Sequence, residues 1–148
     1  MANLEFVRDF AVAPKEVFVF LVPQRMPLWY GVEMSACFEV QGGASDFAVG
    51  QKVQITGWLG SRKVALTVVI TAYEWERLLE WQFQDSYGVR GKQRWELQKA
   101  GAATRLVMRD EYAMPGAFGR FVDRFFTRYA VAARDRAWLD RLHQLAVH

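Results

Sequence analysis

The sequence predicts an α+β domain in which a concave antiparallel sheet of about seven strands packs against one long C-terminal helix. Two observations predict it. Between residues 34 and 112, apolar and polar residues alternate in six segments joined by short turns, which is typical of an antiparallel meander. After the breaker Met114–Gly116, apolar residues recur at three- and four-residue steps almost to the C-terminus. Such a helix requires an apolar surface to lie in, and the sheet is expected to supply it.

Length and composition indicate a single domain spanning residues 1–148, with no repeat, low-complexity segment or linker. The only cysteine, Cys37, excludes an intramolecular disulfide and cysteine-rich zinc sites, and we expect it to be a buried small hydrophobe. A reducing, cytoplasmic location is therefore expected. Residues 1–10 do not resemble a secretory signal, and the longest apolar run, Val64–Ile70, is too short to cross a bilayer.

Charge and motif content exclude several other classes. The net charge is +3, but acidic and basic residues are interleaved, so we expect no nucleic-acid partner. The only histidines, His143 and His148, lie in the C-terminal tail, so neither a histidine-rich metal site nor a serine-histidine triad is indicated. No phosphate-cradling loop follows Gly42 and Gly43. We therefore expect no metal and no cofactor.

The N-terminal elements are a strand and two short helices. Alternation predicts a strand over Leu4–Val12, and Pro14 begins a short helix over Lys15–Leu21 that Pro23 ends. A second helical piece is predicted over Met26–Tyr30, carrying the rings of Trp29 and Tyr30.

Six further strands follow from period-two alternation and from glycine-containing turns at Gly42–Gly50, Gly60–Ser61, Asp85–Gly91 and Lys99–Ala102. Their predicted cores are Ala36–Val40, Lys52–Thr56, Lys63–Glu74, Leu79–Gln84, Arg94–Gln98 and Arg105–Tyr112. One face of this meander is expected to be exposed to solvent, and the other is expected to be lined by aromatic side chains.

The predicted C-terminal helix has two faces of interest. Phe118, Val122, Phe125, Tyr129 and Ala133 form an apolar stripe. Arg120, Arg124 and Arg128 fall at four-residue steps, and a basic stripe of this kind suits a transient contact with a membrane surface or an acyl carrier. The alternative is an ordinary solvated helix face, whose charge Asp123 and Asp135 partly offset.

The order and spacing of these elements resemble the START-like superfamily (SRPBCC), which has the fold of the birch pollen allergen, and most closely its polyketide cyclase/dehydrase branch. The likeness spans nearly the whole chain and is carried by Phe10–Phe18, Trp29, Gly50, Gly57, Trp81, Trp95, Thr104–Leu106, Met114–Gly116, Gly119, Arg120, Leu139 and Leu142. The resemblance implies a helix-grip fold with a hydrophobic cavity between sheet and helix. Members of the superfamily bind or transport lipids, sterols and polyketides, and some cyclise or dehydrate polyketide chains.

A large apolar set could line that cavity or simply fill the core. Apolar periodicity usually reports packing, whereas the resemblance favours a pocket in which rings hold the two layers apart. The candidates are Trp29, Phe38, Trp81, Phe83, Trp95, Leu106, Met108, Tyr112, Phe121, Val122, Phe125, Phe126 and Tyr129.

Asp110 is the most informative polar residue, because alternation places it on the same face as Leu106, Met108 and Tyr112. A desolvated carboxylate facing a cavity can act as a general acid or base, so Asp110 and Tyr112 are the catalytic candidates. The alternative is that Asp110 lies near the strand end and is solvated or paired with an arginine.

The leading hypothesis is the binding of a small to medium hydrophobic molecule of the lipid, aromatic polyketide or isoprenoid type. One alternative is a cyclase or dehydratase that uses Asp110 and Tyr112, and substrate turnover would distinguish it from a carrier. Another is an interaction protein whose interior is filled by its own rings. The sequence leaves the ligand, the oligomeric state and the existence of a reaction open.

Overall fold

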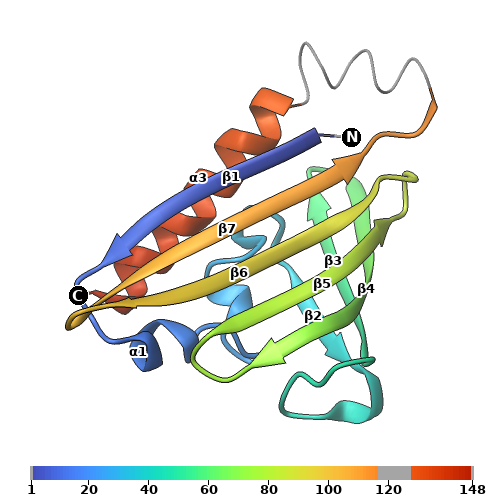
Figure 1. Ribbon diagram of the computed structural model, residues 1–148. Coiled ribbons are helices and arrows are strands. Elements are labelled where there is room, and N and C mark those ends of the chain that lie inside the picture. Colours follow the sequence, from blue (N-terminus) through green and yellow to red (C-terminus); the bar gives the residue numbers. More distant parts are fainter. Residues whose placement is uncertain (1, 117–127, 148) are drawn as a thin grey trace.

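The computed structural model describes residues 2–116 and 128–147, and its strands form one antiparallel sheet (Figure 1). The strand order is β1-β7-β6-β5-β4-β3-β2, so the predicted meander is confirmed and the N-terminal strand pairs with the last one. The strands are β1 (Ala2–Phe10), β2 (Cys37–Val40), β3 (Lys52–Leu59), β4 (Arg62–Glu74), β5 (Leu78–Asp85), β6 (Arg90–Ala100) and β7 (Ala103–Ala113).

Short helical segments join β1 to β2, as predicted, but they are shorter than expected. They are α1 (Pro14–Phe18), η1 (Met26–Leu28) and η2 (Val32–Met34), and a further turn, η3 (Gln41–Gly43), follows β2. Gly31 separates η1 from η2 with a left-handed φ of 66°, a conformation that residues with a Cβ rarely adopt.

The described part of the C-terminal helix is α3 (Arg128–Ala146), which lies across the concave face of the sheet (Figure 1). The predicted start of this helix after Gly116 lies outside the described residues. Within residues 2–116 and 128–147, no helix has both the length and the apolar content to cross a membrane.

Strands β6 and β7 extend beyond the predicted cores. Arg90 pairs with Ala113 at one end of this ladder and Ala100 pairs with Ala103 at the other, so the two flanking turns contract. Pairing along a long neighbour explains the extension, because each added residue satisfies backbone groups that alternation alone does not reveal.

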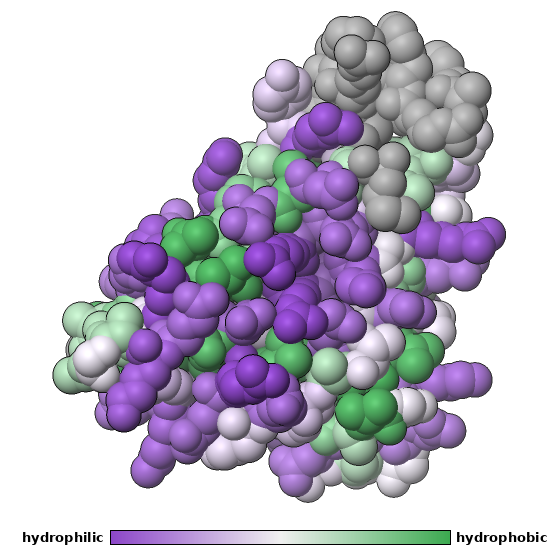
Figure 2. Space-filling view, in the orientation of Figure 1, coloured by the Kyte–Doolittle hydropathy of each residue, from purple (hydrophilic) through white to green (hydrophobic). Residues whose placement is uncertain are grey.

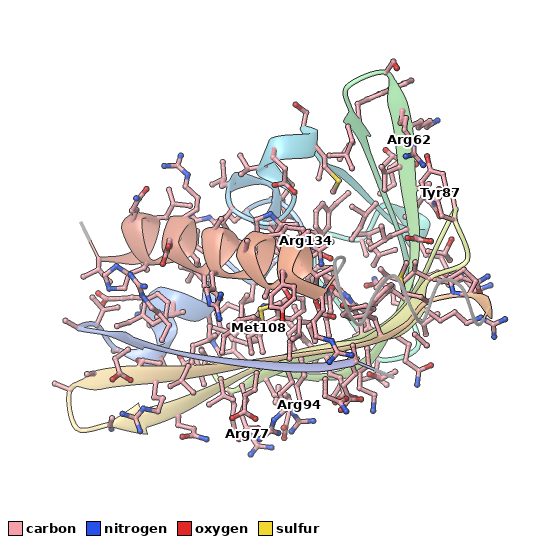
Figure 3. All side chains as sticks on the ribbon, turned by 90° about the horizontal axis from the view of Figure 1, so that it is seen from above. Arg62, Arg77, Tyr87, Arg94, Met108 and Arg134 are labelled. Carbon is pink, nitrogen blue, oxygen red and sulfur yellow. The ribbon has the colours of Figure 1, made fainter. Side chains whose placement is uncertain are left out.

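The convex face of the sheet is polar. Ion pairs join Arg105 to Asp9 at 2.9 Å and Arg94 to Glu80 at 2.7 Å, and Arg77 and Arg94 point away from α3 (Figure 3). Hydrophilic side chains cover most of this face (Figure 2). An exposed pair such as Arg105–Asp9 contributes little to stability, so the fold depends mainly on the concave face.

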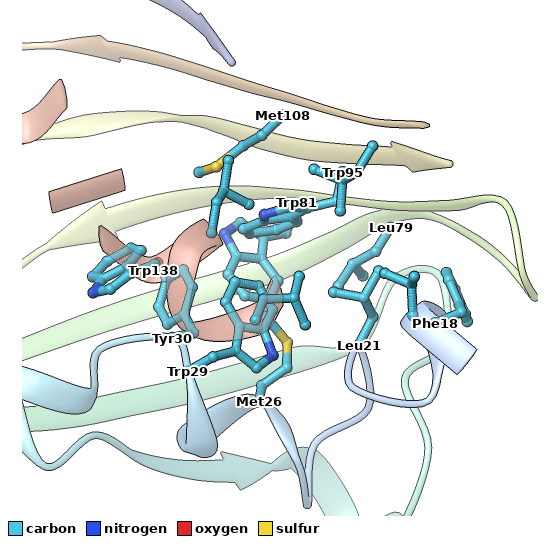
Figure 4. Close-up of a cluster of buried hydrophobic side chains, with 14 of the residues drawn as sticks. Phe18, Leu21, Met26, Trp29, Tyr30, Leu79, Trp81, Trp95, Met108 and Trp138 are labelled. Atoms are coloured by element: carbon cyan, nitrogen blue, oxygen red, sulfur yellow. The ribbon is translucent and has the colours of Figure 1, made fainter. Parts of the chain in front are cut away.

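Aromatic rings fill one part of the space between the sheet and α3 (Figure 4). Trp81 and Trp95 meet edge to face with centroids 4.8 Å apart, and Trp29 packs on Trp95 at 6.0 Å. Tyr30 lies 4.2 Å from Trp138 of α3. The helix is therefore held to the sheet through rings, which pack well in such tilted and edge-to-face pairs.

Candidate functional site

A cavity of about 410 Å³ lies beside these rings, between the concave sheet and α3. Its size falls within the range of about 300–1,000 Å³ that is typical of small-molecule sites. Side chains from the η1–η2 region, from β3 to β7 and their turns, and from α3 line it: Tyr30, Glu33, Met34, Leu59, Arg62, Val64, Leu66, Phe83, Asp85, Tyr87, Val89, Gln93, Asp110, Tyr112, Met114, Val131, Arg134 and Trp138.

Gln93 organises one polar part of the cavity wall. Its Oε1 accepts hydrogen bonds from the hydroxyl of Tyr30 at 2.7 Å and from Nε1 of Trp81 at 2.9 Å. Its Nε2 donates to Oδ2 of Asp110 at 3.5 Å. The amide therefore connects the ring cluster to the carboxylate and fixes the direction in which each polar group points.

Arg134 lies between two buried carboxyl groups. Its guanidinium donates to Oδ2 of Asp110 at 3.4 Å and to Oδ1 of Asp135 at 3.2 Å, and its charge stacks 4.5 Å over the Trp138 ring. Asp110 is 1% exposed and Asp135 is fully buried, whereas the side chain of Arg134 is 38% exposed. One arginine at the edge of the cavity thus contacts two buried acids.

These charges hold one extra proton in the site. Burial, followed by the hydrogen bond and the charge of Asp110, raises the pKa of Asp135 to about 9, so at neutral pH this acid is protonated. Burial also raises the pKa of Tyr30 far above its ordinary value, so its phenol keeps its proton. The site therefore holds the protonated Asp135 beside Asp110, and Asp110 is the member of the pair that lines the cavity.

The mouth of the cavity is apolar with one basic group. Leu59 is 50% exposed and Tyr87 is 46% exposed, and the guanidinium of Arg62 lies 4.6 Å above the Tyr87 ring. Figure 3 shows Arg62, the first residue of β4, beside Tyr87 of the β5–β6 turn. On the other side of the cavity, Trp138 donates from Nε1 to Glu33 of η2 at 2.7 Å, which joins α3 to that turn.

The structure distributes the sequence-predicted residues among several environments. Phe83, Asp110 and Tyr112 line the cavity. Five others are fully buried in the core, where they pack against one another and do not line the cavity: Trp29, Trp81, Trp95, Leu106 and Met108. Phe38 is half-buried and packs against that core.

The remaining candidates come from the C-terminal segment. Tyr129 is 72% exposed, because it lies on the side of α3 opposite its buried residues, so it does not contribute to the cavity wall. Phe121, Val122, Phe125 and Phe126 lie outside the described residues, as do Arg120 and Arg124 of the basic stripe. Cys37 was predicted to be buried, and this prediction is wrong: the thiol is exposed, because β2 is the edge strand of the sheet.

The alternative considered for Asp110 was partly right. It is paired with an arginine, as that interpretation had it, but it is buried and not solvated. Because Arg134 comes from α3 and not from the sheet, β-strand alternation could place the carboxylate but not its partner.

Sequence reasoning missed Arg134, Asp135 and Gln93. Asp135 was assigned to a solvated face, but it shares the buried face of α3 with Trp138, Leu139 and Leu142. The spacing of three, four and seven residues from Asp135 to these apolar residues was the signal that could have found it. Among the described residues, no group of three histidine, cysteine or acidic side chains is arranged to hold a metal ion.

Comparison with known proteins gives one family. The family model described as "Polyketide cyclase / dehydrase and lipid transport" matches residues 1–147. No curated protein is a significant match.

Solved structures share the fold at low sequence identity. The Mll3558 protein of Rhizobium loti has a TM-score of 0.78 at 17% identity, with 97% of this chain and 96% of that chain covered. The MLL2253 protein of Mesorhizobium loti has a TM-score of 0.75 at 16% identity, with the same coverage of each chain. DynU16, a protein of the dynemicin biosynthetic locus, has a TM-score of 0.65 at 15% identity, with 96% of this chain and 46% of that chain covered. These similarities establish the shared architecture.

Proposed function

The chain belongs to the polyketide cyclase/dehydrase and lipid transport family of START-like proteins, and on this premise we propose that it binds a small to medium apolar molecule in the cavity between the sheet and α3. The molecule is of the lipid, aromatic polyketide or isoprenoid type. The observation that carries the proposal is the cavity itself, which lies beside a well-packed core and is not filled by it.

The lining supports an apolar ligand with one polar end. Met34, Leu59, Val64, Leu66 and Val131 supply apolar surface from several elements. Burying ligand surface against them contributes about 25 cal/mol per Å², from which the cost of association is subtracted. Tyr30, Gln93 and Arg134 gather around Asp110, and we expect this end of the cavity to orient the ligand.

Native mass spectrometry of the freshly purified protein tests the proposal. We expect an apolar molecule to co-purify and to be released on denaturation. Val64→Trp should reduce its amount at least about tenfold, because the larger ring occupies the cavity that Val64 lines. Val7→Trp is the matched control, since Val7 lies on β1 and is 54% exposed. An unchanged load in Val64→Trp would put the molecule elsewhere and contradict the proposal.

A second candidate function is acid–base catalysis on a ketone. The observation that favours it is the buried carboxyl pair, because a group that holds a proton and a neighbour that accepts one are both present. In this function, Asp110 takes a proton from the carbon beside the carbonyl, and the hydroxyl of Tyr112 lies on the same wall.

Hydrogen–deuterium exchange at the methyl group of acetylnaphthalene, followed by NMR in deuterated buffer, tests the second candidate. The base removes the methyl proton and returns a deuteron from solvent, so no other reactant is needed. We expect Asp110→Asn to slow exchange about a hundredfold and Asp9→Asn, an exposed control, to leave it unchanged. Equal rates in Asp110→Asn and wild type would remove the hypothesis.

Two further expectations concern the filled-interior alternative and the cellular location. The presence of the cavity supports binding over the interaction protein with a filled interior. We propose a reducing, cytoplasmic compartment, which the exposed and unpaired thiol of Cys37 supports.

A further inference from the structure

We propose that the cavity selects apolar molecules whose polar end donates a hydrogen bond, a hydroxyl or a protonated amine, and rejects those that end in a carboxylate. This inference rests on the proposed binding function and names the class of ligand that the site takes. It is carried by the way the charged groups of the cavity are already paired.

The acids that line the cavity outnumber the bases among the described residues. Glu33, Asp85 and Asp110 are the acids, and Arg62 and Arg134 are the bases. Asp85 is engaged by its own turn, where Oδ1 accepts from the backbone of Tyr87 and Val89. Away from the mouth, the charged groups that line the cavity are therefore the exposed Glu33, the buried Asp110 and the partly exposed Arg134.

The positive charge of Arg134 is already paired within the protein and is not available to a ligand anion. It contacts two acids, Asp110 and Asp135, and stacks on Trp138. The other arginine, Arg62, lies over the Tyr87 ring at the mouth, away from Arg134 (Figure 3). A ligand carboxylate placed against the polar wall would therefore meet Asp110 with no unpaired cation nearby. A buried anion without a partner costs several kcal/mol.

Asp110 has the opposite property, since it can accept more hydrogen bonds than it receives. A carboxylate has about four acceptor sites. Its Oδ2 receives Gln93 and Arg134 only at 3.5 and 3.4 Å, which are long distances for hydrogen bonds. Its Oδ1 is buried and receives no N–H from the described residues, and the protonated Asp135 is the neighbour that can donate to it. Asp110 therefore keeps acceptor sites that a hydroxyl or ammonium group of a ligand can fill.

Glu33 favours the same ligands. It lines the cavity, and its Oε2 accepts from Trp138 Nε1 at 2.7 Å. Glu33 is exposed, so solvent screens part of its charge, but its sign is that of Asp110, and at its end of the cavity it attracts a donor and opposes an anion.

A matched series of naphthalene derivatives tests the inference at neutral pH. Naphthol and naphthylmethylamine carry donors, naphthoate carries an anion, and methoxynaphthalene carries neither, with each substituent on the same ring carbon. Binding is measured by titration calorimetry with wild type, Asp110→Asn and Glu33→Gln. We expect naphthol or naphthylmethylamine to bind at least about tenfold more tightly than naphthoate, because one lost or opposed polar contact is worth that much.

The variants connect the preference to the named residues. Asp110→Asn should reduce the preference for donors over naphthoate to less than about threefold, and Glu33→Gln should reduce it in part. Asp9→Asn, which removes an exposed acid that is also paired with an arginine, should preserve it. If Asp110→Asn does not fold, as judged by its thermal transition, the preference measured with Glu33→Gln decides the test.

The outcomes separate this inference from the function on which it rests. If methoxynaphthalene and naphthoate bind as tightly as the donors, the cavity binds apolar molecules but the inference is wrong. If naphthol alone or the amine alone is preferred, that compound identifies which donor the site takes, and the inference holds. If no member of the series binds, the proposed function and the inference are both wrong.

Discussion

The guanidinium of Arg134 on α3 lies 3.4 Å from Oδ2 of Asp110 on β7, and this contact joins the helix to the sheet at the wall of the cavity. Arg134 is 38% exposed while Asp110 is 1% exposed, so the charge that compensates the buried acid comes from the solvent side. Asp135, the neighbour of Arg134 in the chain, brings a second acid to the same place. Because one arginine cannot balance two carboxylates, the site keeps a proton.

That proton predicts how stability depends on pH. The pKa of Asp135 is raised from 3.8 to about 9, so between these values the native protein binds a proton that the unfolded chain has lost. The free energy of unfolding should therefore fall as pH rises through this window and level off above about 9. The slope is at most about 1.4 kcal/mol per pH unit.

Asp135→Asn should remove most of this slope, because the amide stays neutral at every pH. Urea unfolding at a series of pH values between 5 and 9 measures it, and the variant should gain stability relative to wild type as pH rises. Asp140→Asn is the matched control, since Asp140 is an exposed acid on the same helix and pairs with an arginine, Arg8. The same slope in Asp135→Asn and wild type would show that no buried proton is held there.

Gln93 gives a second prediction, about stability alone. Gln93→Leu keeps a similar size but leaves the hydroxyl of Tyr30 and Nε1 of Trp81 buried without their acceptor. Each unsatisfied donor costs about 1–3 kcal/mol, so we expect a loss of about 2–5 kcal/mol in the free energy of unfolding. Urea unfolding checks this. Gln98→Leu on the same strand is the control, because Gln98 is exposed and its loss should stay within about 0.5 kcal/mol.

The predictability of the fold differs between local and long-range features. Period-two alternation placed Asp110 and Tyr112 on the inner face of β7, and both are buried there. The order of β2 to β7 followed from short connections, whereas the pairing of β1 with β7 joins segments far apart in the chain and did not. The ends of β6 did not follow, because they depend on how far β7 extends as a pairing partner.

The candidate site was harder to predict, because its residues come from different layers. The pairing of Asp110 with Arg134 joins residues whose distance depends on how α3 docks, and no spacing in the chain encodes it. Alternation also cannot separate a ring that lines a cavity from one that fills a core. Trp81 and Phe83 share a face of β5, yet Trp81 packs in the core and Phe83 lines the cavity.

Gly57 gives the last prediction, which concerns the position of η2. A Cβ at Gly57 would lie 2.8 Å from both Cβ and the carbonyl oxygen of Met34, so β3 and η2 pack closely only because residue 57 has no side chain. Gly57→Ala should push η2 away from β3 and cost about 1–3 kcal/mol in the free energy of unfolding. Because η2 carries Glu33 and Met34, which line the cavity, the affinity for naphthol should fall as well. Thr56→Ala, at the preceding position on the other face of β3, is the control and should preserve the affinity. A Gly57→Ala protein with wild-type stability and affinity would contradict the prediction, because the close packing of β3 against η2 would then matter neither for folding nor for the cavity.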